Sequence, residues 1–128
     1  MSVLGVEDNA VAACALNFTL TDLGAKVTLA ETGKEALNFV ASQHFDFIIL
    51  DFDLPDMKGP DIAKQIRQWE AEKKESPKPL FLLTASLDSK REQRCIEAGI
   101  DVVFTKPLTA HKIQRICRKL KEHLIFNA

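Results

Sequence analysis

Five polar side chains fall at places in the sequence where short apolar runs end. Glu7 and Asp8 follow residues 3–6, Asp51 closes the run 47–51, Thr84 closes the run 80–84, and Lys106 comes just after residues 101–104. Three carboxylates brought together repel one another unless a cation joins them. Their oxygens suit Mg²⁺ or Mn²⁺, and a lysine and a hydroxyl beside such a cation form a cradle for an anion such as a phosphoryl group. The residue types therefore predict a metal-assisted phosphoryl site, provided that the fold gathers them.

The runs before these side chains have the composition of buried parallel strands. We expect strands at residues 3–6, 26–30, 47–51, 80–84 and 101–104, and helices at residues 10–23, 34–43, 60–74, 89–98 and 109–126. Strands that alternate with helices in this way predict an α/β fold, a parallel sheet with helices on its faces. In such sheets ligands bind beyond the carboxyl ends of the strands, where the five polar side chains fall. Residues 70–79, which are charged and end in Ser-Pro-Lys-Pro, are interpreted as the longest loop.

Length and composition limit the class of protein. The chain has 128 residues, of which 46% are hydrophobic and 27% are charged, so we expect one globular domain over residues 1–128. Lys and Arg number 17 against 18 for Asp and Glu, which predicts no contact of this domain with nucleic acid or with a membrane. Because the beginning of the chain has no signal-peptide pattern and no run long enough to span a membrane, we expect a cytoplasmic location.

The segments around the polar side chains together resemble the receiver domains of response regulators in two-component and phosphorelay signalling. The resemblance covers essentially the whole chain and depends on residues 6–9, 49–59, 83–85 and 104–107, which read Val-Glu-Asp-Asn, Ile-Leu-Asp-Phe-Asp-Leu-Pro-Asp-Met-Lys-Gly, Leu-Thr-Ala and Phe-Thr-Lys-Pro. The first and last of these segments look most like receivers attached to hybrid sensor kinases. The resemblance implies a flavodoxin-like, doubly wound, five-stranded parallel sheet in the order 2-1-3-4-5, with five helices.

The resemblance also implies a role for each residue of the site. Asp51 would accept a phosphoryl group from a phosphohistidine on a sensor histidine kinase or a histidine phosphotransfer protein. Glu7 and Asp8 would hold Mg²⁺ together with the carboxylate of Asp51 and the backbone carbonyl of Asp53. Lys106 would pair with one phosphoryl oxygen. A receiver of this kind catalyses its own phosphorylation and dephosphorylation and is not a conventional enzyme.

Two further residues would transmit the change, according to the same resemblance. The hydroxyl of Thr84 would turn inward to a phosphoryl oxygen, and the ring of Phe104 would rotate into the space that this movement leaves. The surface of the fourth helix, the fifth strand and the fifth helix would change as a result. Phe104 stands where the family often has Tyr, and the chain contains no tyrosine at all. The bond between Lys106 and Pro107 is often cis in this family.

The expected helix at residues 10–23 has an unusual composition, because residues 10–21 contain no charged side chain. A helix that packs on a sheet by one face normally has a polar back. If Val11, Ala15 and Leu23 face the core, Cys14 and Phe18 point elsewhere. Either neighbouring loops cover these two residues, or the two form an apolar patch that marks a docking surface. Receivers commonly dock this helix against the helical bundle that bears the histidine, so Phe18 and Cys14 are candidate docking residues.

The sequence is also compatible with two other interpretations. The Asp51-Phe52-Asp53 segment reads as the nucleophile and acid pair of a haloacid dehalogenase-type phosphohydrolase. That pair follows the first strand in such enzymes, whereas here two expected strands and the Glu7-Asp8 pair precede it. The second alternative is a receiver-like binding module that works without phosphorylation, and nothing in the sequence favours it, because every expected site residue is present.

Overall fold

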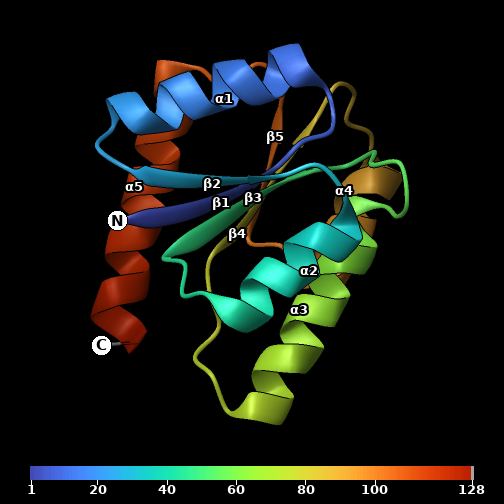
Figure 1. The fold of residues 1–128 in the computed structure, drawn as a ribbon, viewed down its shortest axis with the longest axis vertical. Coiled ribbons are helices and arrows are strands. Elements are labelled where there is room, and N and C mark those ends of the chain that lie inside the picture. The colour runs from blue at the N-terminus through green and yellow to red at the C-terminus, as the bar shows by residue number, and fades with distance from the viewer. Residues whose placement is uncertain (128) are drawn as a thin grey trace.

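Five parallel strands form the sheet of the computed structural model, which describes residues 1–127. The strands lie in the order β2-β1-β3-β4-β5 (Figure 1). Their bounds are Ser2–Val6 for β1, Lys26–Ala30 for β2, Phe47–Asp51 for β3, Leu80–Thr84 for β4 and Val102–Thr105 for β5. The chain therefore has the expected flavodoxin-like, doubly wound order, with the winding reversed between β1 and β3.

Helices connect the strands and cover both faces of the sheet (Figure 1). Helices α1 and α5 lie on one face, and α2, α3 and α4 lie on the other. In the part of the chain that the structure describes, no helix is both long enough and apolar enough to cross a membrane. The bounds are Ala10–Asp22 for α1, Gly33–Ser42 for α2, Gly59–Lys73 for α3, Ser89–Glu97 for α4 and Ala110–Asn127 for α5.

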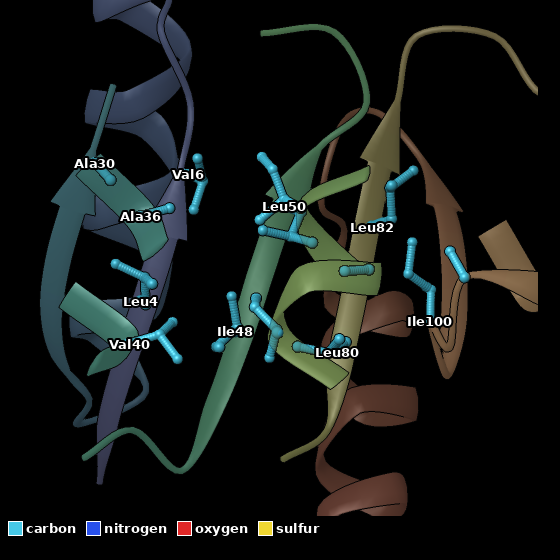
Figure 2. Close-up of a cluster of buried hydrophobic side chains, with 14 of the residues drawn as sticks. Leu4, Val6, Ala30, Ala36, Val40, Ile48, Leu50, Leu80, Leu82 and Ile100 are labelled. Atoms are coloured by element: carbon cyan, nitrogen blue, oxygen red, sulfur yellow. The ribbon is translucent and has the colours of Figure 1, made fainter. Parts of the chain in front are cut away.

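Alternate residues of the central strands supply two hydrophobic cores. In β3, Ile48 and Leu50 join the cluster under α2, α3 and α4 (Figure 2), whereas Phe47 and Ile49 join the cluster under α1 and α5. All five residues of β3 and all five of β4 are buried, because helices cover both faces. Two-sided burial explains why these strands are continuous apolar runs in the sequence. It also makes the polar side chains at the strand ends conspicuous.

The expected helix at residues 60–74 and the expected loop at residues 70–79 overlap, and the structure confirms the helix for the shared residues up to Lys73; the other expected bounds lie within a residue or two of those observed. Glu70 belongs to α3 and is only 2% exposed. Its carboxylate accepts the backbone N–H of Lys78 at 2.7 Å and pairs with the guanidinium of Arg67 at 2.9 Å. The charge of Glu70 favours a loop in the sequence, because the Lys78 N–H that makes its burial tolerable comes from a segment outside the helix.

Candidate functional site

Three carboxylates meet at the carboxyl edge of the sheet. Glu7 and Asp8 follow β1, and Asp51 ends β3, the neighbour of β1 in the sheet. One carboxylate oxygen from each residue lies within 4.8 Å of the other two. Glu7 is 6% exposed and Asp51 is 9% exposed, whereas Asp8 is open to solvent. The acidic group that the sequence predicted therefore forms, with two members shielded from water and one accessible.

Lys106 lies against this acidic group. Its Nζ is 2.7 Å from Oε1 of Glu7 and 3.1 Å from Oδ1 of Asp51. The pairing of β4 with β5 places it there, because Thr84 lies opposite Thr105 and the backbone N–H of Lys106 donates to the carbonyl of Thr84 at 2.8 Å. The peptide bond between Lys106 and the next residue, a proline, is cis, as the resemblance implied. Lys106 follows β5, which lies two places from β3 in the sheet, and its ammonium thus reaches the carboxylates from that strand.

Burial and neighbouring charges separate the pKa values of these groups. Burial raises the pKa of Asp51 to about 6, with the Lys106 ammonium acting against this rise and the charge of Glu7 adding to it. Burial also acts to raise the pKa of Glu7, but hydrogen bonds from Lys106 and from the N–H of Asn9 outweigh it and hold that pKa below its usual value. Burial acts to lower the pKa of Lys106, yet its bonds to both carboxylates prevail and raise it. Of the two buried carboxyl groups, Asp51 is therefore the one that holds a proton more easily.

Thr84 and Phe104, the two expected switch residues, are both buried. Thr84 is the last residue of β4, which lies next to β3, the strand that ends at Asp51. Its hydroxyl donates to the carbonyl of Ser86 at 2.9 Å. The ring of Phe104 is 2% exposed and stacks on Phe81 with 6.2 Å between ring centroids. The guanidinium of Arg115 lies 5.1 Å from the Phe104 centroid. The phenyl ring therefore lies in the core under α1 and α5, on the face of the sheet opposite α4.

The loop between β3 and α3 is held close to the acceptor strand. A Cβ atom on Gly59 would lie 2.6 Å from the backbone oxygen of Asp51, so no larger residue fits at that position without a shift of the backbone. The carboxylate of Asp56 accepts the backbone N–H groups of Gly33 and Lys34 at the start of α2, at 2.8 and 3.0 Å. These N–H groups lie at the start of a helix, where free backbone donors bind anions. Their hydrogen bonds lower the pKa of Asp56, and the bond from Gly33 has the largest effect. Sequence reasoning missed this contact because its partners lie more than twenty residues apart.

Asp53 lies in the same loop, two residues after the acceptor. Its carboxylate pairs with Lys58 and with Arg91 of α4, and the Lys58 hydrogen bond is the main cause of its lowered pKa. Neither cation was singled out from the sequence, since Lys58 reads as a solvated loop residue and Arg91 as one charge among many on a polar helix. The carboxylate of Asp53 thus points to cations, and only its backbone carbonyl is expected at the metal.

The expectation for the core face of α1 is wrong, but the two docking candidates are exposed. Leu16 and Leu20 are the buried residues of α1, while Val11 is 80% exposed. Phe18 is 76% exposed and Cys14 is also exposed, so neighbouring loops do not cover them. Because residues 10–21 of α1 carry no charge, no charged face marks the solvent side of this helix in the sequence, which is why the sequence did not settle its orientation.

Comparison with known proteins decides the family. The sequence profile of the response regulator receiver domain matches residues 3–118. The chain belongs to the response regulator receiver domain family. Sensor histidine kinase GacS of Pseudomonas protegens is 32% identical over 117 residues, which cover 91% of this receiver domain and 13% of GacS. The chain thus spans a small part of that relative, as the resemblance to receivers of hybrid sensor kinases implied.

Two solved structures extend the comparison of this receiver domain. The receiver domain of sensor histidine kinase PA1611 from Pseudomonas aeruginosa PAO1, with a magnesium ion coordinated in its active site cleft, is 30% identical with a TM-score of 0.81. The match covers 93% of this receiver domain and 95% of that chain. The co-crystal structure of the Saccharomyces cerevisiae phosphotransfer protein Ypd1 and the receiver domain of Ssk1 matches with 27% identity and a TM-score of 0.87, over 97% of this chain and 90% of that one.

These matches do not favour the two alternatives. A phosphohydrolase of the haloacid dehalogenase type would carry its aspartate pair after the first strand, whereas Asp51 ends the third strand of a receiver fold. A binding module that works without phosphorylation would have no need for Lys106 to lie 3.1 Å from Asp51 beside two further carboxylates. The family and the geometry therefore point to a phosphoacceptor domain in a signalling protein.

Proposed function

We propose that Asp51 of this receiver domain accepts a phosphoryl group from a phosphohistidine of a partner protein, in a metal-dependent phosphorelay in the cytoplasm. The observation that carries this proposal is the meeting of Glu7, Asp8, Asp51 and Lys106 at one edge of the sheet. Phosphoryl transfer depends on positioning and on charge neutralisation more than on covalent chemistry. A carboxylate nucleophile with a cation site on one side and an ammonium on the other meets both needs. Residues 1–128 act as one domain in this proposal.

The residues present fit a divalent cation. Three carboxylates supply hard oxygen ligands within 4.8 Å of one another, and the exposed Asp8 leaves room for water in the remaining positions, as Mg²⁺ prefers. Glu7, Asp8 and Asp51 would hold Mg²⁺, or Mn²⁺, together with the backbone carbonyl of Asp53. When bound, the cation offsets negative charge on the oxygens of the transferred group.

The proposed transfer is a single in-line displacement. An oxygen of Asp51 attacks the phosphorus, the new P–O bond forms as the P–N bond to the partner's imidazole breaks, and the electron pair of that bond leaves with the imidazole. Lys106, which now lies between Glu7 and Asp51, is placed to donate to a phosphoryl oxygen as charge gathers there. Thr84 then bonds a second phosphoryl oxygen, and its movement alters the surface of α4, β5 and α5.

Removal of the metal tests this proposal directly. Incubation with acetyl phosphate and Mg²⁺ should add one phosphoryl group, measured as intact mass, and EDTA should slow this addition by at least about 100-fold. Three carboxylates without a cation would repel the incoming anion, which is the reason for so large an effect. Equal phosphorylation with and without EDTA would contradict the proposal. Catalytic turnover of p-nitrophenyl phosphate would instead support a phosphohydrolase.

Metal affinity should depend on pH through Asp51, whose pKa is raised to about 6 chiefly by burial. A carboxyl group must lose its proton to coordinate a cation, so the apparent Mg²⁺ affinity should fall about tenfold for each pH unit below 6 and level off above. In the absence of metal the raised pKa has the opposite consequence for folding: the stabilising protonated form of Asp51 is lost as pH rises from about 4 through 6. Calorimetric Mg²⁺ titrations between pH 5 and pH 8 measure the first effect, and an affinity that stays flat across pH 6 would contradict it.

The exposed apolar residues of α1 support a partner surface beside the acceptor. Helix α1 begins two residues after Asp8, and Val11, Cys14 and Phe18 form an exposed apolar stripe along it. A cavity of about 230 Å³ lies between α1 and the segment after β5, lined mostly by apolar side chains and also by Glu7, Thr19 and Lys106. We propose that a sensor histidine kinase or a histidine phosphotransfer protein docks its helices on this stripe, so that its phosphohistidine faces Asp51.

Phe18→Ser should weaken this docking. An exposed aromatic side chain that becomes buried in an interface is a typical anchor, so we expect the phosphotransfer rate at limiting partner to fall about tenfold. Phosphorylation by acetyl phosphate should stay unchanged, since Phe18 does not contact the acidic group. Ile96→Ser on α4 is the matched control, because Ile96 is also an exposed large apolar residue but lies on another helix. Equal phosphotransfer by the wild type and Phe18→Ser would refute the docking role.

A further inference from the structure

The guanidinium of Arg91 connects α4 to the residues around the acceptor. Its Nη1 lies 3.4 Å from Oγ1 of Thr84 and 3.7 Å from Oδ2 of Asp53. Its Cζ lies 4.3 Å from the ring centroid of Phe52. Phe52 and Asp53 directly follow Asp51 in the chain, and Thr84 ends the strand next to it. Three residues that neighbour the acceptor therefore hold the side chain of Arg91, which is 34% exposed.

The one hydrogen that the hydroxyl of Thr84 can donate is already committed in this arrangement. The hydroxyl donates this hydrogen to the carbonyl of Ser86 at 2.9 Å, and its oxygen accepts from Arg91. To donate to a phosphoryl oxygen on Asp51, the hydroxyl must release the Ser86 carbonyl and turn away from Arg91. Arg91 therefore stabilises the orientation in which Thr84 is unavailable to the phosphoryl group.

We propose that Arg91 is a positioning residue that holds Thr84 in its resting orientation and thereby lowers the affinity of the site for a phosphoryl group. The inference rests on the proposed function and adds to it the element that opposes switching. When a ligand binds only one of two orientations of a side chain, its apparent affinity is reduced in proportion to the population of that orientation. Removal of Arg91 raises that fraction, and Asp53 does not become unpaired, because Lys58 still neutralises it.

Beryllofluoride with Mg²⁺, a non-covalent analogue of a carboxyl-bound phosphoryl group, tests the proposal on the whole chain by fluorine NMR titration. Arg91→Ala is expected to bind beryllofluoride about fivefold more tightly than the wild type, as the loss of one charged hydrogen bond to the resting state predicts. Arg91→Lys keeps the charge but not the planar guanidinium, and it should also bind more tightly.

Arg94→Ala is the matched control. Arg94 lies on the same helix, carries the same charge and faces the same Phe52 ring with its Cζ at 5.7 Å, but it pairs with Asp61 and not with Thr84. Arg94→Ala therefore removes one positive charge from α4 but leaves the hydrogen bond between Arg91 and Thr84 in place. The beryllofluoride affinity should stay within about twofold of the wild type.

Several outcomes would overturn the proposal. These are an Arg91→Ala affinity that is unchanged or lower, or a change of equal size in the two alanine variants. Urea unfolding shows whether each variant folds, and if Arg91→Ala does not, Arg91→Lys decides. A wild-type chain that binds no beryllofluoride in the presence of Mg²⁺ would instead contradict the proposed function, so the two failures are distinguishable.

Discussion

An Asp51→Asn variant should gain no phosphoryl group from acetyl phosphate and Mg²⁺ under conditions in which the wild type gains one. The amide has nearly the shape of the carboxylate, but its oxygen is a poor nucleophile and it supplies no charge to a cation. Asp51 also contributes one of the three oxygens that lie within 4.8 Å of one another, so the same change weakens the metal site. Both effects act on the same step, which makes this the largest loss expected of any single substitution. Intact-mass measurement over time gives the result.

Asp53→Asn is the matched control for that experiment. It makes the same chemical change two residues further on, in a side chain that pairs with Lys58 and Arg91 and not with the acidic group. This variant should still gain one phosphoryl group. If Asp51→Asn shows the same mass increase of one phosphoryl group as the wild type, or if both variants lose it equally, the acceptor must lie elsewhere.

The Asp51→Asn variant should also be more stable than the wild type at pH 7 without metal, which excludes unfolding as the cause of its inactivity. Burial, with the charge of Glu7 adding to it, raises the pKa of Asp51 to about 6, so the ionised carboxylate is disfavoured in the folded state. A neutral amide removes that cost, and we expect the free energy of unfolding to rise by about 1–2 kcal/mol. The difference should vanish near pH 4, where the wild-type carboxyl is protonated in the folded state.

The sheet and the acidic group could be predicted from the sequence because both depend on local features. These are the apolar runs that form the strands and the polar residues at the ends of those runs. The uninterrupted apolar run before Asp51 is what burial on both faces of a sheet requires, and it was observed as β3. Parallel strands bring their carboxyl ends to one edge, so the positions of Glu7, Asp51 and Lys106 at strand ends predict that they lie at the same edge.

Contacts between distant segments could not be predicted in the same way. The burial of Glu70, where an expected helix and an expected loop overlap, depends on the backbone N–H of Lys78, which reaches its carboxylate only when the chain folds back after α3. Arg91 is one of several charged residues on α4, and nothing local distinguishes it from its neighbours. Residues 10–21 of α1 carry no charge that would mark its solvent face, and the choice of Leu16 and Leu20 for the core depends on the shape of the sheet beneath.

Lys106→Met should slow phosphorylation by about 100-fold while leaving the acceptor in place. Methionine keeps the length of the side chain but cannot donate to a phosphoryl oxygen, and a donor of this kind is worth about 2.7–4 kcal/mol to the transition state. The variant also leaves Glu7 and Asp51 without the ammonium that lies 2.7 and 3.1 Å away, so the pKa values of both carboxyl groups should rise. Phosphorylation kinetics at saturating Mg²⁺ measure the rate.

The same substitution separates the structural role of Lys106 from its chemical role. Without metal, Lys106→Met should unfold at lower urea, since a buried carboxylate at Glu7 loses its closest partner. Mg²⁺ should restore this stability and bind more tightly than in the wild type, because a competing cation has been removed, yet the rate should stay low. Lys112→Met is the control, because the Lys112 ammonium bonds the carbonyls of Thr105 and Pro107 on either side of Lys106 without facing the carboxylates. A rate that recovers together with stability would mean that Lys106 only holds the site together, and donation to the phosphoryl group would have to be abandoned.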